Sequence, residues 1–311
     1  MDVEALIAGV LAGERRAVAR AISAVEDGAP ELPAISAGLY ARTGTAATIG
    51  LTGAPGVGKS TLAGELVRAA REAGRTVAVL AVDPTSPYTG GALLGDRVRM
   101  QEHATDEGVF IRSMATRGHL GGMSLAAPEA VRILDAAGYD LVIVETVGVG
   151  QAEVDVAAAT DTALVVLAPG LGDAVQMAKA GILEVADVFV VNKADRDGAN
   201  EVVRELHQML RMGPPRTWAP PVLATAALER RGIAELWEAV DEHRGHLTAS
   251  GDLEGKRRAR QLREVESLAA ERFRLRAAAT LEDDAGLLAD LASRRIDPYA
   301  AADQLARGSP A

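Results

Sequence analysis

The sequence contains no cysteine, and this absence removes several classes of chemistry. A 311-residue chain without cysteine forms no disulfide bond, has no thiol nucleophile, and binds no zinc ion or iron–sulfur cluster through thiolates. Long apolar runs are also missing, since none approaches the roughly 18 residues that a membrane-spanning helix needs. The segment Met1–Glu4 lacks a basic region followed by an apolar stretch, so we expect no secretory signal. We therefore expect a cytoplasmic protein with no membrane partner.

Lysine and asparagine are rare. The 33 basic side chains comprise four lysines and 29 arginines, and the only asparagines are Asn192 and Asn200. Against this background, a lysine or asparagine indicates a position where its close substitute would not serve equally well. The 43 acidic residues give a net charge of −10, which argues against nucleic acid as a partner.

Sequence pattern divides the chain into three zones. Residues 1–44 carry apolar residues at helical spacing and predict a helical extension of two or three short helices. Residues 45–250 alternate β-branched runs with helical segments such as Ser60–Ala73 and Ala174–Ala186. Most of these runs are apolar at successive positions, as expected for strands buried on both faces, so the predicted fold class is α/β, a mostly parallel sheet covered by helices on both faces. The predicted strands are Ala46–Leu51, Thr76–Val82, Val109–Ser113, Tyr139–Glu145, Thr162–Leu167, Val188–Val191 and Val222–Thr225.

Residues 251–311 return to a helical pattern. Leu262, Val265, Ala269 and Phe273 fall on one stripe of a predicted helix. Such a stripe must be covered, either by the chain's own domain or by a partner subunit, and both alternatives stay open. The pair Asp297-Pro298 predicts the start of a last helix, with aspartate as N-cap and proline at the first helical position.

The most specific motif is a glycine-rich loop between a predicted strand and a predicted helix. It consists of Gly53, Ala54, Pro55, Gly56, Val57, Gly58, Lys59 and Ser60, followed by Thr61. This pattern is typical of a loop that binds nucleotide triphosphates. Glycines allow backbone N–H groups to approach a phosphate, and the helix N-terminus attracts an anion. We expect Lys59 to reach the β- and γ-phosphates and Ser60 to coordinate Mg²⁺.

A second motif predicts that the base is guanine. Asn192, Lys193 and Asp195 follow the predicted strand Val188–Val191 in the pattern N-K-x-D. A carboxylate such as Asp195 accepts hydrogen bonds from N1–H and the exocyclic amine of guanine, whereas adenine offers an acceptor at N1. We expect Asn192 to join this loop to the phosphate loop and the stem of Lys193 to cover the ring. The segment Thr225, Ala226 and Ala227 is expected to offer backbone N–H groups to the base oxygen. GTP and GDP are therefore expected rather than ATP.

Three acidic residues are candidates for binding Mg²⁺ with Ser60. Asp83 and Glu145 stand at the ends of predicted strands, and Asp96 lies in the segment after Asp83. Mg²⁺ takes few protein carboxylates together with phosphates and water. The alternative for each acid is a helix cap or a solvated loop residue. Lys59, Asp96 and Glu145 are the predicted catalytic residues. His103 and His119 lack companions at metal-ligand spacing, so no dedicated zinc or nickel site is expected.

Taken together, the motifs resemble those of the MeaB/ArgK-like GTPases, bacterial relatives of the methylmalonic aciduria type A protein. The segments that carry the resemblance are Gly53–Thr61, Val82–Pro87, Asp96–Met100, Thr116–Gly122, Val144–Gln151, Pro169–Asp173, Gln176 with Lys179–Ile182, and Asn192–Asp195. The resemblance implies a homodimeric, Mg²⁺-dependent GTPase that gates adenosylcobalamin loading and protects or reactivates methylmalonyl-CoA mutase or a related acyl-CoA mutase. It also implies slow GTP hydrolysis without the partner.

The same resemblance assigns roles to particular residues. Asp83, Asp96 and Glu145 match switch acids, and the segment around Gln176 and Lys179 matches a switch that contacts the mutase. The C-terminal helices match a dimerisation arm. One departure is visible at Ala226, where the family often has serine, so a hydroxyl contact to the base would be lost while backbone contacts survive.

Three other functions remain as alternatives. The first is a P-loop kinase or ATPase of a transport system, the older interpretation of ArgK-like proteins. The second is a metallochaperone GTPase for nickel enzymes, which the missing cysteine and scarce histidine oppose. The third is a scaffold that binds GTP without hydrolysing it.

Overall fold

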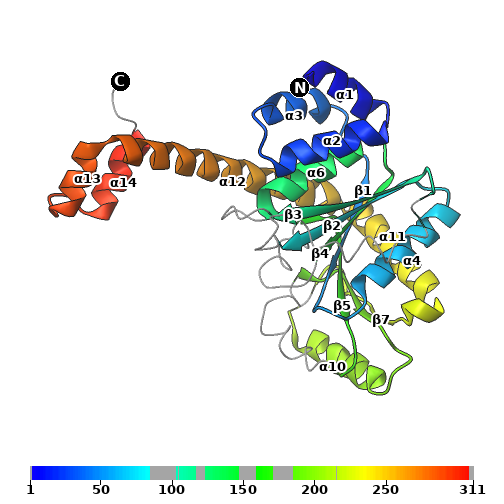
Figure 1. The fold of residues 1–311 in the computed structure, drawn as a ribbon. Coiled ribbons are helices and arrows are strands. Elements are labelled where there is room, and N and C mark those ends of the chain that lie inside the picture. The colour runs from blue at the N-terminus through cyan, green and yellow to red at the C-terminus, as the bar shows by residue number, and fades with distance from the viewer. Residues whose placement is uncertain are drawn as a thin grey trace. The chain divides into compact units, whose positions relative to one another are not determined.

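The computed structural model describes residues 2–84, 103, 105–116, 123–146, 159–170, 185–214 and 216–307 (Figure 1). Internal contacts divide the chain into two compact units, Met1–Arg260 and Gln261–Ala311. The first unit contains the sheet, whereas the described part of the second unit is helical throughout apart from its turns.

The first unit is built on a parallel sheet whose seven strands, within the described residues, follow the order β3-β2-β4-β1-β5-β6-β7. These strands are β1 (Ala47–Thr52), β2 (Val77–Pro84), β3 (Val109–Thr116), β4 (Leu141–Thr146), β5 (Thr162–Leu167), β6 (Val188–Val191) and β7 (Val222–Ala224). All seven predicted strands are confirmed. Thr162–Leu167 and Val188–Val191 match to the residue, and the other five differ by one to three residues at an end. Every residue of β1, β4, β5 and β6 is buried, as continuous apolar runs predict.

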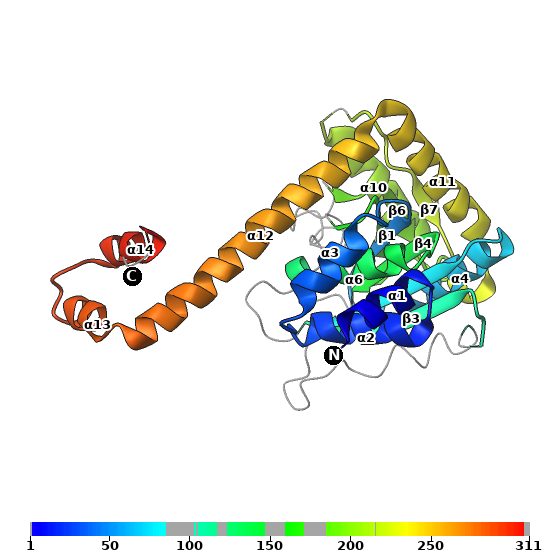
Figure 2. The ribbon, with the colours of Figure 1, turned by 90° about the horizontal axis from the view of Figure 1, so that it is seen from above.

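Helices cover both faces of this sheet, as the sequence predicts (Figure 2). One face packs against α4 (Lys59–Glu72) and α11 (Ile233–Ser250). The other face packs against the N-terminal helices and α6 (Met123–Ala136) over β2 to β4, and against α10 (Ala199–Met212) over β5 and β6. Because side chains alternate along a strand, Leu80 belongs to one core and Val79 to the opposite one.

The N-terminal segment forms three helices, α1 (Val3–Leu11), α2 (Arg15–Glu26) and α3 (Leu32–Tyr40), in agreement with the predicted two or three. Its buried residues share one core with β2, β3, β4 and α6. Arg15 Nη1 donates a hydrogen bond of 2.7 Å to the carbonyl oxygen of Val109, and Arg112 forms an ion pair with Glu26. These contacts connect the N-terminal helices to β3.

A buried carboxylate fixes the beginning of α12 (Asp252–Asp283) to the sheet. Asp161, just before β5, accepts hydrogen bonds from Arg257 Nη2 at 2.7 Å and Arg260 Nη2 at 2.6 Å. Burial alone would raise the pKa of Asp161, but the two guanidinium groups outweigh burial and lower it below its usual value. The backbone N–H of Asp161 also donates to Thr48 Oγ1 at 2.7 Å. The first turns of α12 are therefore joined to β1 and β5.

Asp187, just before β6, makes a second connection to α12. Its carboxylate lies 3.0 Å from Lys256 Nζ and 3.3 Å from Nε2 of the buried His243. Burial opposes the charged form of Asp187, but the His243 hydrogen bond and the charge of Lys256 prevail, so the pKa is lowered. The residues just before β5 and β6, two adjacent strands, therefore both bind the first turns of α12.

The second unit contains the rest of α12 together with α13 (Ala285–Ala292) and α14 (Pro298–Arg307). The predicted start of the last helix is confirmed, because Asp297 Oδ1 accepts hydrogen bonds from the backbone N–H groups of Tyr299 at 2.8 Å and Ala300 at 3.0 Å. Along the described ranges, no helix has both the length and the apolar character to cross a membrane.

Candidate functional site

The phosphate loop connects β1 to α4, and two of its glycines occupy positions that no other residue fits. Gly53 has a φ of +142°, and a Cβ atom there would lie 2.1 Å from the carbonyl oxygen of Val166. Gly58 has a φ of +97°, and a Cβ atom there would lie 2.4 Å from Asn192 Nδ2. The loop therefore packs closely against β5 on one side and the segment after β6 on the other.

Lys59 is the first residue of α4 and is buried. Its ammonium group donates hydrogen bonds to the carbonyl oxygens of Gly53 at 2.6 Å and Ala54 at 3.0 Å. The positive charge thus lies over the loop, beside the N-terminus of a helix of 14 residues, whose first N–H groups favour an anion. A phosphate at this position would meet both the ammonium group and the helix N-terminus.

The sheet places Glu145 beside the phosphate loop. In the pairing of β1 with β4, Glu145 lies opposite Leu51, two residues before the loop begins. Ser60 Oγ donates a hydrogen bond of 2.6 Å to Glu145 Oε1, and both side chains are buried. The structure therefore brings together Ser60 and Glu145, two of the predicted magnesium ligands.

Asn192 connects three loops at the carboxyl edge of the sheet. Its Nδ2 donates to the carbonyl oxygen of Val57 in the phosphate loop at 2.9 Å. Its Oδ1 accepts from Thr225 Oγ1 and from the backbone N–H of Ala227, each at 3.2 Å. Asn192 is almost completely buried, so these bonds account for a polar side chain that would otherwise be costly. The hydroxyl of Thr225 is directed to Asn192 and supports it.

Lys193 and Asp195 stand where this segment meets the phosphate loop. Lys193 has a left-handed backbone with a φ of +57°, and its Nζ donates to the carbonyl oxygen of Gly56 at 2.5 Å. Asp195 follows two residues later and is exposed, so its carboxylate is accessible to a ligand. In parallel sheets of this type, ligands bind at the carboxyl ends of the strands, and all of these groups lie there.

The segment after β7 is closed on itself. The N–H of Ala226 donates to the carbonyl oxygen of Arg231 at 3.0 Å, and that of Ala227 donates to Asn192 Oδ1. The N–H of Thr225 donates to the carbonyl oxygen of Val191 at 2.9 Å, so all three N–H groups expected to meet the base oxygen have acceptors within the protein. A base oxygen at this position would have to share or replace these acceptors.

Several predicted residues lie outside the described part of the structure. They are Asp96, His119, Gln176 and Lys179, together with most of the predicted helix Ala174–Ala186. Asp83 lies within β2, at its carboxyl end and beyond the pairing of Val82 with Thr146 of β4, but only its backbone is described. The predicted magnesium set is thus described at Ser60 and Glu145 alone.

Comparisons with known proteins give the family. The family model described as "Methylmalonyl Co-A mutase-associated GTPase MeaB" matches residues 18–282 of the chain. The chain belongs to the MeaB family. The resemblance found in the sequence is therefore confirmed, and this MeaB-family chain is a P-loop GTPase whose fold binds guanine nucleotides.

Individual relatives agree with the MeaB assignment. A relative from Pyrococcus horikoshii is 48% identical over 305 residues, which cover 97% of this chain and 96% of the relative. GTPase ArgK of Escherichia coli is 43% identical over 266 residues, covering 82% of this chain and 79% of ArgK. The mitochondrial methylmalonic aciduria type A homolog of Mus musculus is 36% identical over 274 residues, covering 82% of this chain and 66% of that protein. Among solved structures, a LAO/AO transport system kinase matches with a TM-score of 0.72 and 30% identity, covering 98% of this chain and 96% of that one.

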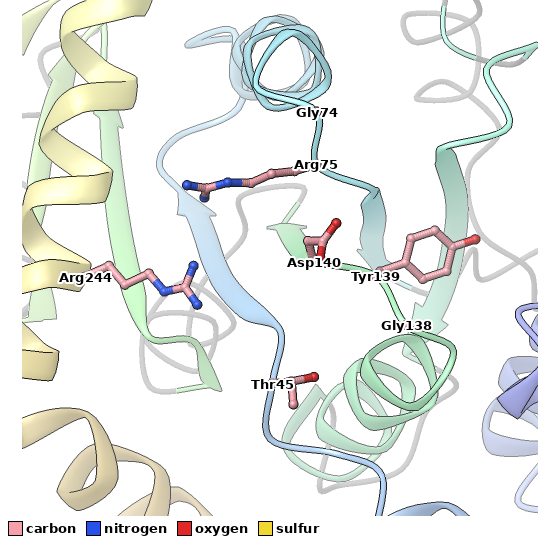
Figure 3. Close-up of a pocket in the computed structure, with 7 residues that line it drawn as sticks. All are labelled: Thr45, Gly74, Arg75, Gly138, Tyr139, Asp140 and Arg244. Carbon is pink, nitrogen blue, oxygen red and sulfur yellow. The ribbon is translucent and has the colours of Figure 1, made fainter.

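A cavity of about 360 Å³ lies at the amino ends of the strands in this MeaB-family chain, opposite the end that carries the phosphate loop (Figure 3). Its lining residues are Thr45, Gly74, Arg75, Gly138, Tyr139, Asp140 and Arg244. Most of them precede β1, β2 or β4, so the cavity lies at the amino ends of the strands, away from the phosphate loop. Figure 3 shows the guanidinium groups of Arg75 and Arg244 on the side of α11 and the carboxylate of Asp140 just before β4. Hydrogen bonds from the backbone N–H and the hydroxyl of Thr76 lower the pKa of Asp140. The cavity is separate from the nucleotide site.

Sequence reasoning missed one contact next to the nucleotide site. Glu65 of α4 lies 3.5 Å from Arg230, which follows the short 3₁₀ helix η2 (Ala227–Glu229). The two residues are 165 positions apart and belong to no recognised motif, so no sequence signal indicated that they meet. Only the packing of α4 against η2 brings them together.

Proposed function

We propose that this MeaB-family GTPase is a cytoplasmic chaperone of an adenosylcobalamin-dependent acyl-CoA mutase, with methylmalonyl-CoA mutase as the first expected client. GTP binding and hydrolysis gate cobalamin loading and protect or reactivate the mutase. The observation that carries the nucleotide part is the network of hydrogen bonds from Asn192 to the phosphate loop and to the segment after β7. The partner follows from the family description over residues 18–282, which names association with methylmalonyl-CoA mutase.

In this proposal, the predicted site residues bind opposite ends of one nucleotide. Lys59 and the backbone of Gly53–Ser60 hold the phosphates, while Asp195 accepts from N1–H and the amine of guanine. The hydrogen bond from Lys193 Nζ to the carbonyl oxygen of Gly56 supports this arrangement, because it joins the N-K-x-D segment to the phosphate loop. Discrimination against adenine follows, since the wrong base would leave the carboxylate without a donor.

The residues Ser60 and Glu145 fit a magnesium site. A serine hydroxyl that donates its proton to a carboxylate keeps its lone pairs for a cation, and Ser60 donates to Glu145 in this way. Hard oxygen donors in small number are what Mg²⁺ uses alongside phosphates and water. Asp83 and Asp96 are proposed to complete the set. When bound, the ion would neutralise charge on the phosphate oxygens.

Hydrolysis then requires little covalent chemistry from the protein. A water molecule attacks the γ-phosphate while Lys59 and the N-terminus of α4 stabilise the charge on the phosphate oxygens. Lys59 is held for this task by carbonyl oxygens of the loop itself. We propose that the mutase, when bound, completes the arrangement of the catalytic groups around the γ-phosphate, so that GTP hydrolysis is slow without it.

The second unit supports a homodimer. Its described helices carry large apolar side chains that are between 41% and 87% exposed: Leu262, Val265, Leu268, Leu275, Leu288 and Tyr299. Exposures of 63% for Val265 and 87% for Tyr299 are high for an isolated subunit. We propose that a second copy of the chain covers them, and sedimentation equilibrium would test this.

The decisive experiment measures GTP hydrolysis with and without purified adenosylcobalamin-dependent methylmalonyl-CoA mutase. We expect the mutase to raise the rate and to co-elute with the chain in a manner that depends on GTP or GDP. The Lys59→Ala variant is the control, because it should lose turnover in both conditions. An unchanged rate together with no complex in either nucleotide state would exclude the mutase as client.

The alternative of a P-loop kinase keeps one supporting observation, the match to a LAO/AO transport system kinase. A kinase would transfer the γ-phosphate to an acceptor other than water. Incubation with γ-labelled GTP or ATP and candidate acceptors distinguishes the two functions. Release of all label as inorganic phosphate would support the GTPase.

A further inference from the structure

Glu65 is an acidic side chain almost buried on the helix that starts at the phosphate loop. It lies about 1.7 turns after Lys59 on α4, and its side chain is 11% exposed. Oε2 accepts two hydrogen bonds from Arg68, at 2.8 Å and 2.6 Å. Oε1 lies 3.5 Å from Nε of Arg230. The carboxylate is thus shared between its own helix and a distant segment, and a buried carboxylate needs such partners.

Arg230 has a backbone conformation in which glycine is the ordinary residue. Its φ is +57° and its ψ is +22°, and its N–H closes the turn η2 by donating to the carbonyl oxygen of Ala227 at 3.1 Å. A residue other than glycine, asparagine or aspartate is uncommon in this region, because its Cβ crowds the backbone. A left-handed backbone at an arginine is therefore a reason to ask what its side chain contacts. The Arg230 side chain, which is 57% exposed, contacts Glu65 of α4.

The turn that Arg230 closes belongs to the segment that faces the base in our proposal. The N–H of Ala227 donates to Asn192 Oδ1, and Ala226 and Arg231 bond to each other through their backbones. Gly232 ends the segment, where a Cβ atom would lie 2.3 Å from the carbonyl oxygen of Ala224. Asn192 therefore connects the base segment to the phosphate loop on one side. The Glu65–Arg230 pair connects the same segment to the phosphate helix on the other side.

We propose that Glu65 and Arg230 are positioning residues for guanine recognition. The pair holds the segment 225–231 against α4. The N–H groups of Ala226 and Ala227, which donate to Arg231 and Asn192 within the protein, are thereby kept where a base oxygen can share them while Lys59 holds the phosphates. Neither residue touches the nucleotide. This inference rests on the proposed guanine site. The Glu65–Arg230 pair adds to Asn192 a second connection between the part of the site that binds the phosphates and the part that binds the base.

The test uses Arg230→Gly, which removes the charge but keeps the turn, because glycine takes a φ of +57° without strain. Binding of GDP and of inosine diphosphate is measured by calorimetry. We expect Arg230→Gly to raise both dissociation constants by about twofold to fivefold, the range for a partly exposed ion pair. The factor is the same for both because both bases carry the oxygen that the segment contacts. The unfolding temperature of the nucleotide-free protein stays unchanged or rises.

Three further variants make the assignment specific. Glu65→Gln should weaken binding by the same factor, and the double variant should lose no more than either single variant. Arg230→Lys should restore part of the affinity. Arg68→Gln is the matched control, since it removes the other partner of Glu65 and leaves the connection to Arg230 in place; GDP affinity should then be unchanged.

Distinct results overturn the inference. An unchanged GDP affinity in Arg230→Gly refutes it, as does a loss confined to GDP, which would assign the effect to the base amine and Asp195. A lower unfolding temperature with unchanged affinity would make the pair merely structural. If the unaltered protein bound no guanine nucleotide, the proposed function itself would fail, and this inference with it.

Discussion

The connection between Asp161 and α12 gives a stability prediction that can be worked out from the structure. Asp161 is 4% exposed, and its carboxylate accepts two hydrogen bonds from Arg257, one from Arg260 and one from the N–H of Thr48. Replacing Asp161 by alanine leaves two guanidinium groups, 24% and 17% exposed, without their carboxylate. The fold would then contain two partly buried charges next to each other.

The magnitude follows from the degree of burial. Removing one partner of a buried ion pair costs about 3–5 kcal/mol, because the other charge stays desolvated. Here both arginines also donate to carbonyl oxygens, Arg257 to Ala46 at 2.8 Å and Arg260 to Ala159 at 2.6 Å, which remain in the variant. We therefore expect Asp161→Ala to lower the free energy of unfolding by about 2–4 kcal/mol. The corresponding fall in Tm is about 3–6 °C for a chain of 311 residues.

The assay is denaturant and thermal unfolding of the nucleotide-free chain, followed by circular dichroism. Asp241→Ala is the matched control, because Asp241 pairs with Arg75 at 3.1 Å but its side chain is 39% exposed. That variant should cost less than about 1 kcal/mol and lose its effect at high salt, whereas the cost of Asp161→Ala should persist. Equal costs for the two variants would refute the reasoning that burial decides the strength of the connection.

The remaining predictions concern the nucleotide site and pH. Asp195→Asn should weaken GTP binding by about 10-fold to 100-fold, the range for hydrogen bonds to a charged group, and ATP binding by much less; equal losses in calorimetry would contradict the guanine assignment. Gly53→Ala should abolish nucleotide binding and destabilise the fold by about 1–3 kcal/mol, because its Cβ would lie 2.1 Å from a carbonyl oxygen. Gly245→Ala is the control, because a Cβ there meets nothing within 4 Å, and it should stabilise α11 by about 0.5–1 kcal/mol in the same melting assay. The pKa values of Asp161 and Asp187 are lower in the folded protein than in the unfolded chain, so the unfolded chain binds more protons and stability falls as pH drops. Their contribution to stability should be complete above about pH 5 and should disappear as pH falls below about 4 toward the folded pKa values. Urea midpoints measured over a pH series should therefore fall less steeply in acid for Asp161→Ala than for the unaltered protein, and an equally steep fall would contradict this expectation.

The elements of the first unit could be predicted from the sequence because their signals are local. A strand buried on both faces needs apolar residues at successive positions, and runs such as Val188–Val191 show this directly. In the second unit, the N-cap at Asp297 is equally local, because it depends on the next three residues only. The phosphate loop and the N-K-x-D segment were equally visible, because each motif is a contiguous stretch whose backbone meets one part of a ligand.

The sequence alone therefore determined the strands, the N-terminal helices, α4, the start of the last helix, the fold class and the family motifs, whereas α6, α10 and α11 were not predicted. Only the tertiary structure decided the strand order, the bonds of Asn192 to Val57 and Thr225, and the pairs Asp161–Arg257 and Glu65–Arg230. These contacts join residues between 33 and 165 positions apart. Whether such residues meet depends on how all the strands and helices pack together, and no local pattern of residues records that outcome.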